Sequence, residues 1–95
     1  DGNLNNGDFS MNATAQLRTT GTGTIAIDAD DALTITNIDS AGAITLDSDG
    51  GGTITLNGNV GNTNGTVTFS DAVSLAGTST VSSTNGSATF SSTID

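Results

Sequence analysis

The apolar residues of this chain recur at intervals of about 21 residues, and this spacing constrains the fold more than any other feature. One set consists of single apolar residues separated by 21, 22 and 21 positions: Leu17, Ile38, Val60 and Val81. Two further sets repeat at nearly the same interval: Leu4, Ile25, Ile44, Val67 and Ala88, and Met11, Ile35, Leu56 and Leu75. Three interleaved sets with a common period indicate a repeat protein.

Within each repeat, apolar residues alternate with small or hydroxylated ones. Segments such as Ile54-Thr55-Leu56 therefore have the two-residue period of a short strand with one buried face. Helices are not expected, because Thr, Ser, Asn, Asp and Gly dominate and no 3.6-residue periodicity occurs. Disorder would be favoured by a hydrophobic content of only 33%, but the regular alternation and the absence of Pro argue against it.

The period and the short strands together predict the fold. At roughly 3.3 Å per residue, one repeat makes one circuit of a narrow coil, and coils stack about 4.8 Å apart through parallel strands. We predict a single all-β domain over residues 1–95, a right-handed parallel β-helix (three-sided β-solenoid) of about four and a half coils, uncapped at both ends. Asn-Gly hairpins in an antiparallel sandwich are the alternative, but they do not explain the spacing.

The charge balance excludes several classes of partner. The chain has ten acidic residues and one basic residue, Arg18, which gives a net charge of −9. Nucleic acids and anionic membrane surfaces are therefore not expected as partners, since both require clustered Lys and Arg. No apolar run is long enough to insert into a membrane. The absence of Cys excludes disulfides and thiolate metal sites.

Acidic residues follow two strands that are one repeat apart. We expect the carboxylates to lie near one another at one corner of the solenoid: Asp28, Asp30, Asp47 and Asp49. Ca²⁺, which binds six to eight oxygen ligands, would relieve the repulsion between such carboxylates. A solvated acidic turn that promotes solubility explains the same residues without a ligand. The sequence therefore predicts no cofactor, with Ca²⁺ at these four residues as the alternative.

Two other functions occur among proteins with this fold. Some β-helix proteins cleave polysaccharides with paired carboxylates, but this chain has no Trp or Tyr to line a sugar-binding groove and no His for serine chemistry. We therefore do not expect an enzyme. Ice binding is the other alternative, because outward Thr and Ser residues would form two flat columns: Thr45, Thr68 and Thr89, and Thr34, Thr55 and Ser74.

Three segments, 41–52, 52–61 and 65–95, share a "GxITL…G" and "VTFxxAVxL" cadence. In this cadence the chain resembles the repeats of filamentous-haemagglutinin-like and autotransporter adhesins. The resemblance implies a secreted structural β-solenoid on a bacterial cell surface, part of a fibre or adhesin stalk, with host or cell-surface glycans as potential ligands. The uncapped ends lead us to expect a fragment of a longer solenoid or end-to-end self-association, because an exposed strand edge invites another strand.

Overall fold

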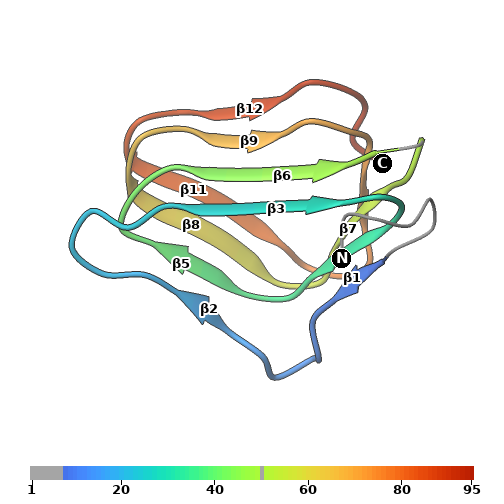
Figure 1. The fold of residues 1–95 in the computed structure, drawn as a ribbon, viewed down its shortest axis with the longest axis horizontal. Helices are drawn as coiled ribbons and strands as arrows, with labels where there is room; N and C mark the ends of the chain where they lie inside the picture. The colour runs from blue at the N-terminus through green and yellow to red at the C-terminus, as the bar shows by residue number, and fades with distance from the viewer. Residues whose placement is uncertain (1–7, 50) are drawn as a thin grey trace.

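A computed structural model of the protein describes residues 8–49 and 51–95, and within these residues it contains strands and no helix. The described residues contain twelve short strands, which form three parallel sheets of four strands each. The chain visits the three sheets in the same order in every coil (Figure 1). The protein is therefore a three-sided β-solenoid of about four coils with a period of about 21 residues, as the sequence predicts.

The three sheets are named A, B and C in the order in which the chain reaches them. Sheet A comprises β1 (Phe9–Ser10), β4 (Leu33–Ile35), β7 (Ile54–Leu56) and β10 (Val73–Leu75). Sheet B comprises β2 (Leu17–Arg18), β5 (Ile38–Ser40), β8 (Asn59–Asn64) and β11 (Thr80–Asn85). Sheet C comprises β3 (Ile25–Ala29), β6 (Ile44–Ser48), β9 (Val67–Phe69) and β12 (Ala88–Phe90).

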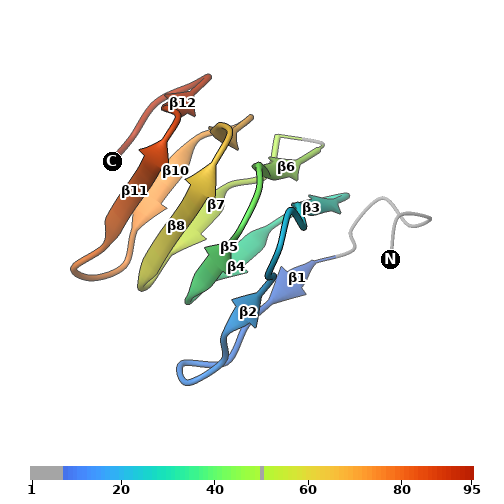
Figure 2. The same cartoon turned by 90° about the vertical axis from the view of Figure 1, so that its left-hand side faces the viewer.

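The register of the strands confirms the predicted columns of apolar residues. Figure 2 shows the strands of sheet B stacked from β2 to β11. Their aligned residues are Leu17, Ile38, Val60 and Val81. Sheet C aligns Ile25, Ile44, Val67 and Ala88, and sheet A aligns Ile35, Leu56 and Leu75. Met11 starts the sheet A column, since its N–H donates to the Thr34 carbonyl at 3.0 Å, whereas Leu4 lies outside the described residues.

The core is a column of apolar side chains that runs through the stack. It is most completely buried in the middle coils, where the fully buried residues include Ile44, Leu46, Ile54, Leu56, Val67 and Phe69. Exposure increases at the C-terminal end of the column: Leu75 is 47% exposed although Leu56, directly below it, is 0% exposed. The rings of Phe69 and Phe90 stack with parallel planes and centroids 4.7 Å apart, so the core keeps its packing up to the last coil.

A ladder of polar side chains lines the corner between sheets B and C. Each side chain donates a hydrogen bond to a glycine carbonyl of the coil before it, so these carbonyls are satisfied although they lie at a bend. The donor–acceptor pairs are Ser40 and Gly23 at 3.1 Å, Asn62 and Gly42 at 3.2 Å, and Ser83 and Gly65 at 3.0 Å.

Glycine is required at this corner for two separate reasons. Gly65 has a φ of 89°, a conformation that L side chains rarely adopt. In the next coil, a Cβ atom on Gly86 would overlap the Gly65 carbonyl oxygen. The corner therefore allows the coils to approach one another closely.

Candidate functional site

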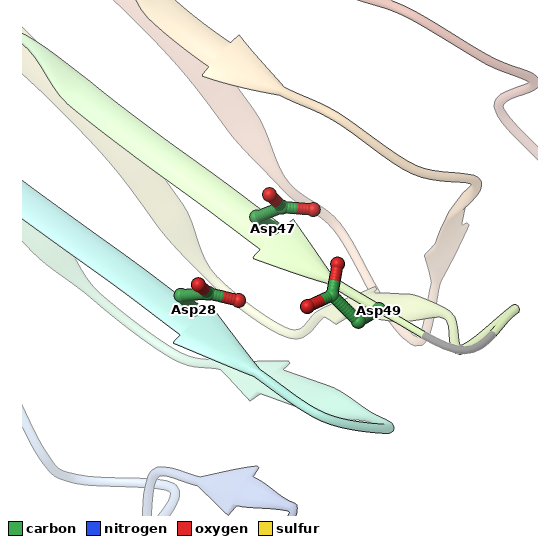
Figure 3. A group of neighbouring side chains, drawn as sticks. All are labelled: Asp28, Asp47 and Asp49. Atoms are coloured by element: carbon green, nitrogen blue, oxygen red, sulfur yellow. The ribbon is translucent and has the colours of Figure 1, made fainter. Parts of the chain in front are cut away.

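Three carboxylates from two neighbouring coils meet near the end of sheet C. Asp28 lies in β3, Asp47 lies in β6, and Asp49 follows β6 directly. One carboxylate oxygen from each residue lies within 4.8 Å of those from the other two (Figure 3). Asp28 and Asp49 are exposed and Asp47 is half-buried. These three residues are called the acidic corner below.

The parallel register of β3 and β6 positions the acidic corner. Asp28 lies directly opposite Asp47 in this pairing. The Asp49 N–H donates to the Ala29 carbonyl at 2.8 Å, which holds the chain beside β3 for two residues after Asp47. Strand side chains alternate between the two faces of a sheet, so Asp28 and Asp47 point outward while Ser48, which is 0% exposed, points into the core.

The electrostatic environment of the acidic corner makes ionisation of Asp47 unfavourable. Partial burial raises the pKa of Asp47 above its ordinary value of 3.8, and a side-chain hydrogen bond with Asp71 raises it further. The negative charges of Asp49, Asp71 and Asp28 act in the same direction. A proton on Asp47, or a cation bound beside it, would therefore relieve the repulsion among the carboxylates of Asp28, Asp47, Asp49 and Asp71.

The structure brings together three of the four predicted site residues. Within the described residues, Asp30 is not part of the acidic corner. It lies in a bend directly after β3, where the strand alternation that directs Asp28 outward no longer applies. Asp71, which was not predicted as a site residue, accepts a hydrogen bond from the Ser48 N–H at 2.8 Å. Aligning the residues that follow Leu46 and Phe69 would have placed Asp71 beside Ser48.

The donor set of the acidic corner suits a hard cation such as Ca²⁺. Each carboxylate offers two oxygens, and oxygen ligands are those that Ca²⁺ prefers. The Arg18 guanidinium does not neutralise this charge, because it pairs with Asp39 at 3.3 Å on sheet B. Among the described residues, the buried hydroxyl of Ser48 has no hydrogen-bond partner, but it faces the core and not the acidic corner. The structure thus supports the grouping of the ligands, and Ca²⁺ binding stays a prediction.

The last described coil differs from the others in how far its strands and apolar residues are covered. Among the described strands, β11 pairs only with β8 and β12 pairs only with β9, so each leaves one edge unpaired. Leu75 and Ile94 are the large apolar residues most exposed at this end, at 47% and 49%.

The outward Thr columns form as predicted. On sheet C, Thr45 pairs in register with Thr68, and Thr68 with Thr89. Thr34, Thr55 and Ser74 form the equivalent column on sheet A. Thr is common in strands because it is β-branched, so these columns do not require an ice-binding role to explain them. Ice binding stays a prediction.

Neither the surface nor comparison with known proteins adds a further site. No pocket opens among the described residues. The described part of the chain contains no helix with the length and apolarity that a membrane crossing requires. The chain matches no protein-family model, no curated protein and no solved structure. The geometry of the solenoid is therefore the basis for a functional proposal.

Proposed function

We propose that the protein is a structural β-solenoid segment of a secreted fibre or adhesin stalk on a bacterial surface. The observation that carries this proposal is the regular parallel stack, in which three sheets keep one strand order through every described coil. A stack of this kind extends by adding coils, because each coil offers the next one the same hydrogen-bonding groups and apolar column. Extension of the stack, by the same chain or by further subunits, produces the elongated shape of a stalk.

The charge of the surface supports the same role. A net charge of −9 makes neighbouring fibres repel one another. Pairing along the axis is less affected, because the carboxylates do not continue from coil to coil. The column that begins with Asp28 and Asp47 continues with Ser70 and Ser91. Lateral repulsion and axial attraction together favour single, unbundled fibres.

Surface labelling of cells that produce the protein tests this function. An antibody raised against the folded chain is expected to label intact, unpermeabilised cells, and protease treatment of intact cells should remove the signal. A cytoplasmic protein of the same cells serves as the control and should be labelled only after permeabilisation. Labelling of the chain that also requires permeabilisation would contradict the proposal.

A calcium-stabilised module is the second candidate, and the acidic corner favours it. Bound Ca²⁺ would stabilise only the folded chain, so millimolar Ca²⁺ should raise the melting temperature relative to EDTA. The expected rise is about 4–8 °C for each kcal/mol that Ca²⁺ adds to the free energy of unfolding. The matched variant Asp47→Asn removes the central ligand charge with little change in shape and should abolish the shift. Equal melting temperatures of the native chain in Ca²⁺ and EDTA would rule this candidate out.

A further inference from the structure

Three Asn residues of the described coils are followed by Gly, the order in which an Asn side chain reacts most readily with the backbone. These pairs are Asn57-Gly58, Asn64-Gly65 and Asn85-Gly86. Gly has no Cβ, so its nitrogen can approach the amide carbon of the preceding side chain closely. Asn57 and Asn64 both lie in a coil with a described coil on either side, so their surroundings can be compared directly.

The reaction in question converts an Asn side chain into a carboxylate. The Gly nitrogen loses its proton and attacks Cγ of Asn, which closes a succinimide ring and releases the side-chain nitrogen as ammonia. Water then opens the ring. Opening at Cγ gives aspartate, whereas opening at the backbone carbonyl gives isoaspartate, in which the main chain runs through Cβ and Cγ.

The Gly65 nitrogen is available for this attack. Asn64 and Gly65 are exposed, and among the described residues the Gly65 N–H has no hydrogen-bond partner. The Asn64 carbonyl, which belongs to the same peptide group, accepts a hydrogen bond from Asn62 Nδ2 at 2.9 Å. When the Gly65 nitrogen loses its proton, much of the negative charge moves to this carbonyl oxygen. The Asn62 donor therefore stabilises the attacking form of the peptide.

The amide group that is attacked is polarised from the following coil. Strands β8 and β11 lie side by side, with Asn85 in register with Asn64 (Figure 2). Asn85 Nδ2 donates to Asn64 Oδ1 at 3.2 Å. Attack on Cγ places negative charge on Oδ1, and a donor already aimed at that oxygen lowers the barrier.

The surroundings of Asn57 protect it instead. The Gly58 N–H donates to Ser79 Oγ at 3.3 Å, so the nitrogen that would attack is engaged. A Cβ atom on Gly58 would overlap the Thr36 carbonyl, which shows that this backbone lies directly against the preceding coil. On Gly65, by contrast, a Cβ atom would approach Ala43 to 3.3 Å. The chain is therefore held more tightly at Gly58 than at Gly65.

We propose that Asn64 is a deamidation site at the corner between sheets B and C, where Asn62 and Asn85 promote attack by the Gly65 nitrogen. The inference goes beyond the proposed function and does not depend on it. Each reaction adds a negative charge, and isoaspartate also inserts a CH₂ group into the main chain between β8 and β9. Both strands are held in register by neighbouring coils, so the longer connection strains the corner.

Ageing of the folded chain at neutral and mildly alkaline pH tests the site. The rate should rise with pH, because base removes the proton from the Gly65 nitrogen. After ageing, denaturation and cleavage before Asp release residues 49–70, which contain both Asn57 and Asn64. Mass spectrometry of this segment measures both reactions in one sample. Asn64 should react at least about tenfold faster than Asn57, which reacts only when its corner opens.

The denatured chain is the control for this comparison. Without the fold, Asn57 and Asn64 are both flexible Asn-Gly pairs and should react at similar rates. Similar rates in the folded chain, or a faster reaction at Asn57, would overturn the proposal. Surface labelling of cells does not depend on deamidation, so the proposed function and the deamidation site can fail separately.

A matched pair of variants tests the role of Asn85. Asn85→Ala removes the donor to Asn64 Oδ1 and should slow the reaction about two- to tenfold. Asn59→Ala removes another exposed Asn, whose Oδ1 accepts from the Thr80 N–H at 3.2 Å, and should leave the rate unchanged. An unchanged or faster reaction in Asn85→Ala, or equal slowing in both variants, would overturn this role. Melting curves verify that both variants fold.

The effect on the stack is measured separately. The melting temperature of the aged chain should fall as isoaspartate accumulates at position 64. Asn64→Gln, whose longer side chain cyclises slowly, should keep its melting temperature over the same period. Asn64→Asp carries the charge without the longer main chain and separates the two effects. A constant melting temperature after conversion of Asn64 would contradict the strain at the corner.

Discussion

At the scale of single residues, two buried serines contribute to stability in opposite directions. Ser40 is 1% exposed and Ser48 is 0% exposed. The Ser40 hydroxyl donates to the Gly23 carbonyl at 3.1 Å and accepts from the Gly42 N–H at 3.2 Å. The Ser48 hydroxyl has no partner among the described residues. A buried polar group without a hydrogen bond costs about 1–3 kcal/mol, so Ser48 lowers the stability of a core that Ser40 reinforces.

Replacing the unpaired hydroxyl should therefore stabilise the protein. We expect Ser48→Ala to raise the free energy of unfolding by about 1 kcal/mol, because it removes the cost of burying the hydroxyl. The small side chain fits, as Ala29 occupies the adjacent place in the same column. Urea denaturation measures the change, and Ser40→Ala is the matched control that should lower stability. Destabilisation by both variants would show that the Ser48 hydroxyl is satisfied in solution.

The acidic corner predicts how stability depends on pH. The pKa of Asp47 is raised in the folded chain, first by burial and then by Asp71, above its ordinary value of 3.8. The folded chain therefore holds this proton more tightly than the unfolded chain, and stability decreases as pH rises through the folded pKa. Asp28, Asp49 and Asp71 are the charged groups that face Asp47.

Lowering the pH from 7 toward about 4 should accordingly raise the melting temperature of the native chain. The variant Asp47→Asn cannot titrate at this position and should show a smaller dependence on pH over the same range. Thermal melts at a series of pH values, at constant ionic strength, measure both curves. Parallel curves for the two proteins would show that Asp47 does not contribute.

At the scale of the strands, position within the stack determines what a residue contributes. Leu56 of β7 and Leu75 of β10 are adjacent in one column of sheet A. Leu56 is covered by coils on both sides and is 0% exposed, whereas Leu75 is 47% exposed. The same residue type in the same column therefore contributes differently in the middle coils and in the last one.

This difference can be measured with a matched pair of truncations. Leu56→Ala should lower the free energy of unfolding by about 2–5 kcal/mol, because it leaves a cavity in a fully packed column. Leu75→Ala removes a partly solvated side chain and should cost clearly less in the monomer. Chemical denaturation at low protein concentration compares them. An equal cost would mean that Leu75 is as well covered as Leu56.

The sequence predicts the columns because register in a solenoid follows from spacing. Leu17, Ile38, Val60 and Val81 recur at nearly constant intervals, and strands at this interval pair without slipping. The sequence predicts exposed edges at the ends of the stack, but not the 47% exposure of Leu75 within the apolar column, since that exposure depends on the coil above and not on the residue itself. The pattern of a strand does not distinguish Leu75 from Leu56.

The candidate site was predicted only in part, for a related reason. Asp28 and Asp47 follow equivalent residues of β3 and β6, so their pairing is a consequence of the period. Asp30 and Asp71 lie beyond the ends of their strands, at corners where alternation no longer determines the direction of a side chain. Corner geometry depends on turns and hydrogen bonds such as that between the Ser48 N–H and Asp71, which spacing alone does not specify.

At the scale of the whole molecule, the proposed stalk needs more coils than the four that the structure describes. The described residues extend over 34 × 27 × 26 Å, so four coils form a body nearly as wide as it is long. Length comes from adding coils at about 4.8 Å each, and the width stays constant. A stalk built in this way gains reach without gaining cross-section.

The direction of the backbone hydrogen bonds gives such a stalk a mechanical property. Bonds between coils, such as that from the Val67 N–H to the Ser87 carbonyl, run along the axis of the stack. Tension along the axis therefore opens one ladder of bonds at a time and peels coils off singly. Each peeled coil of about 21 residues releases roughly 70 Å of chain.

Force spectroscopy on the tethered chain should show steps of this length, whereas one all-or-none extension would contradict peeling. An anchored solenoid of this kind would lengthen gradually under load and keep its attachment, as an extensible tether does.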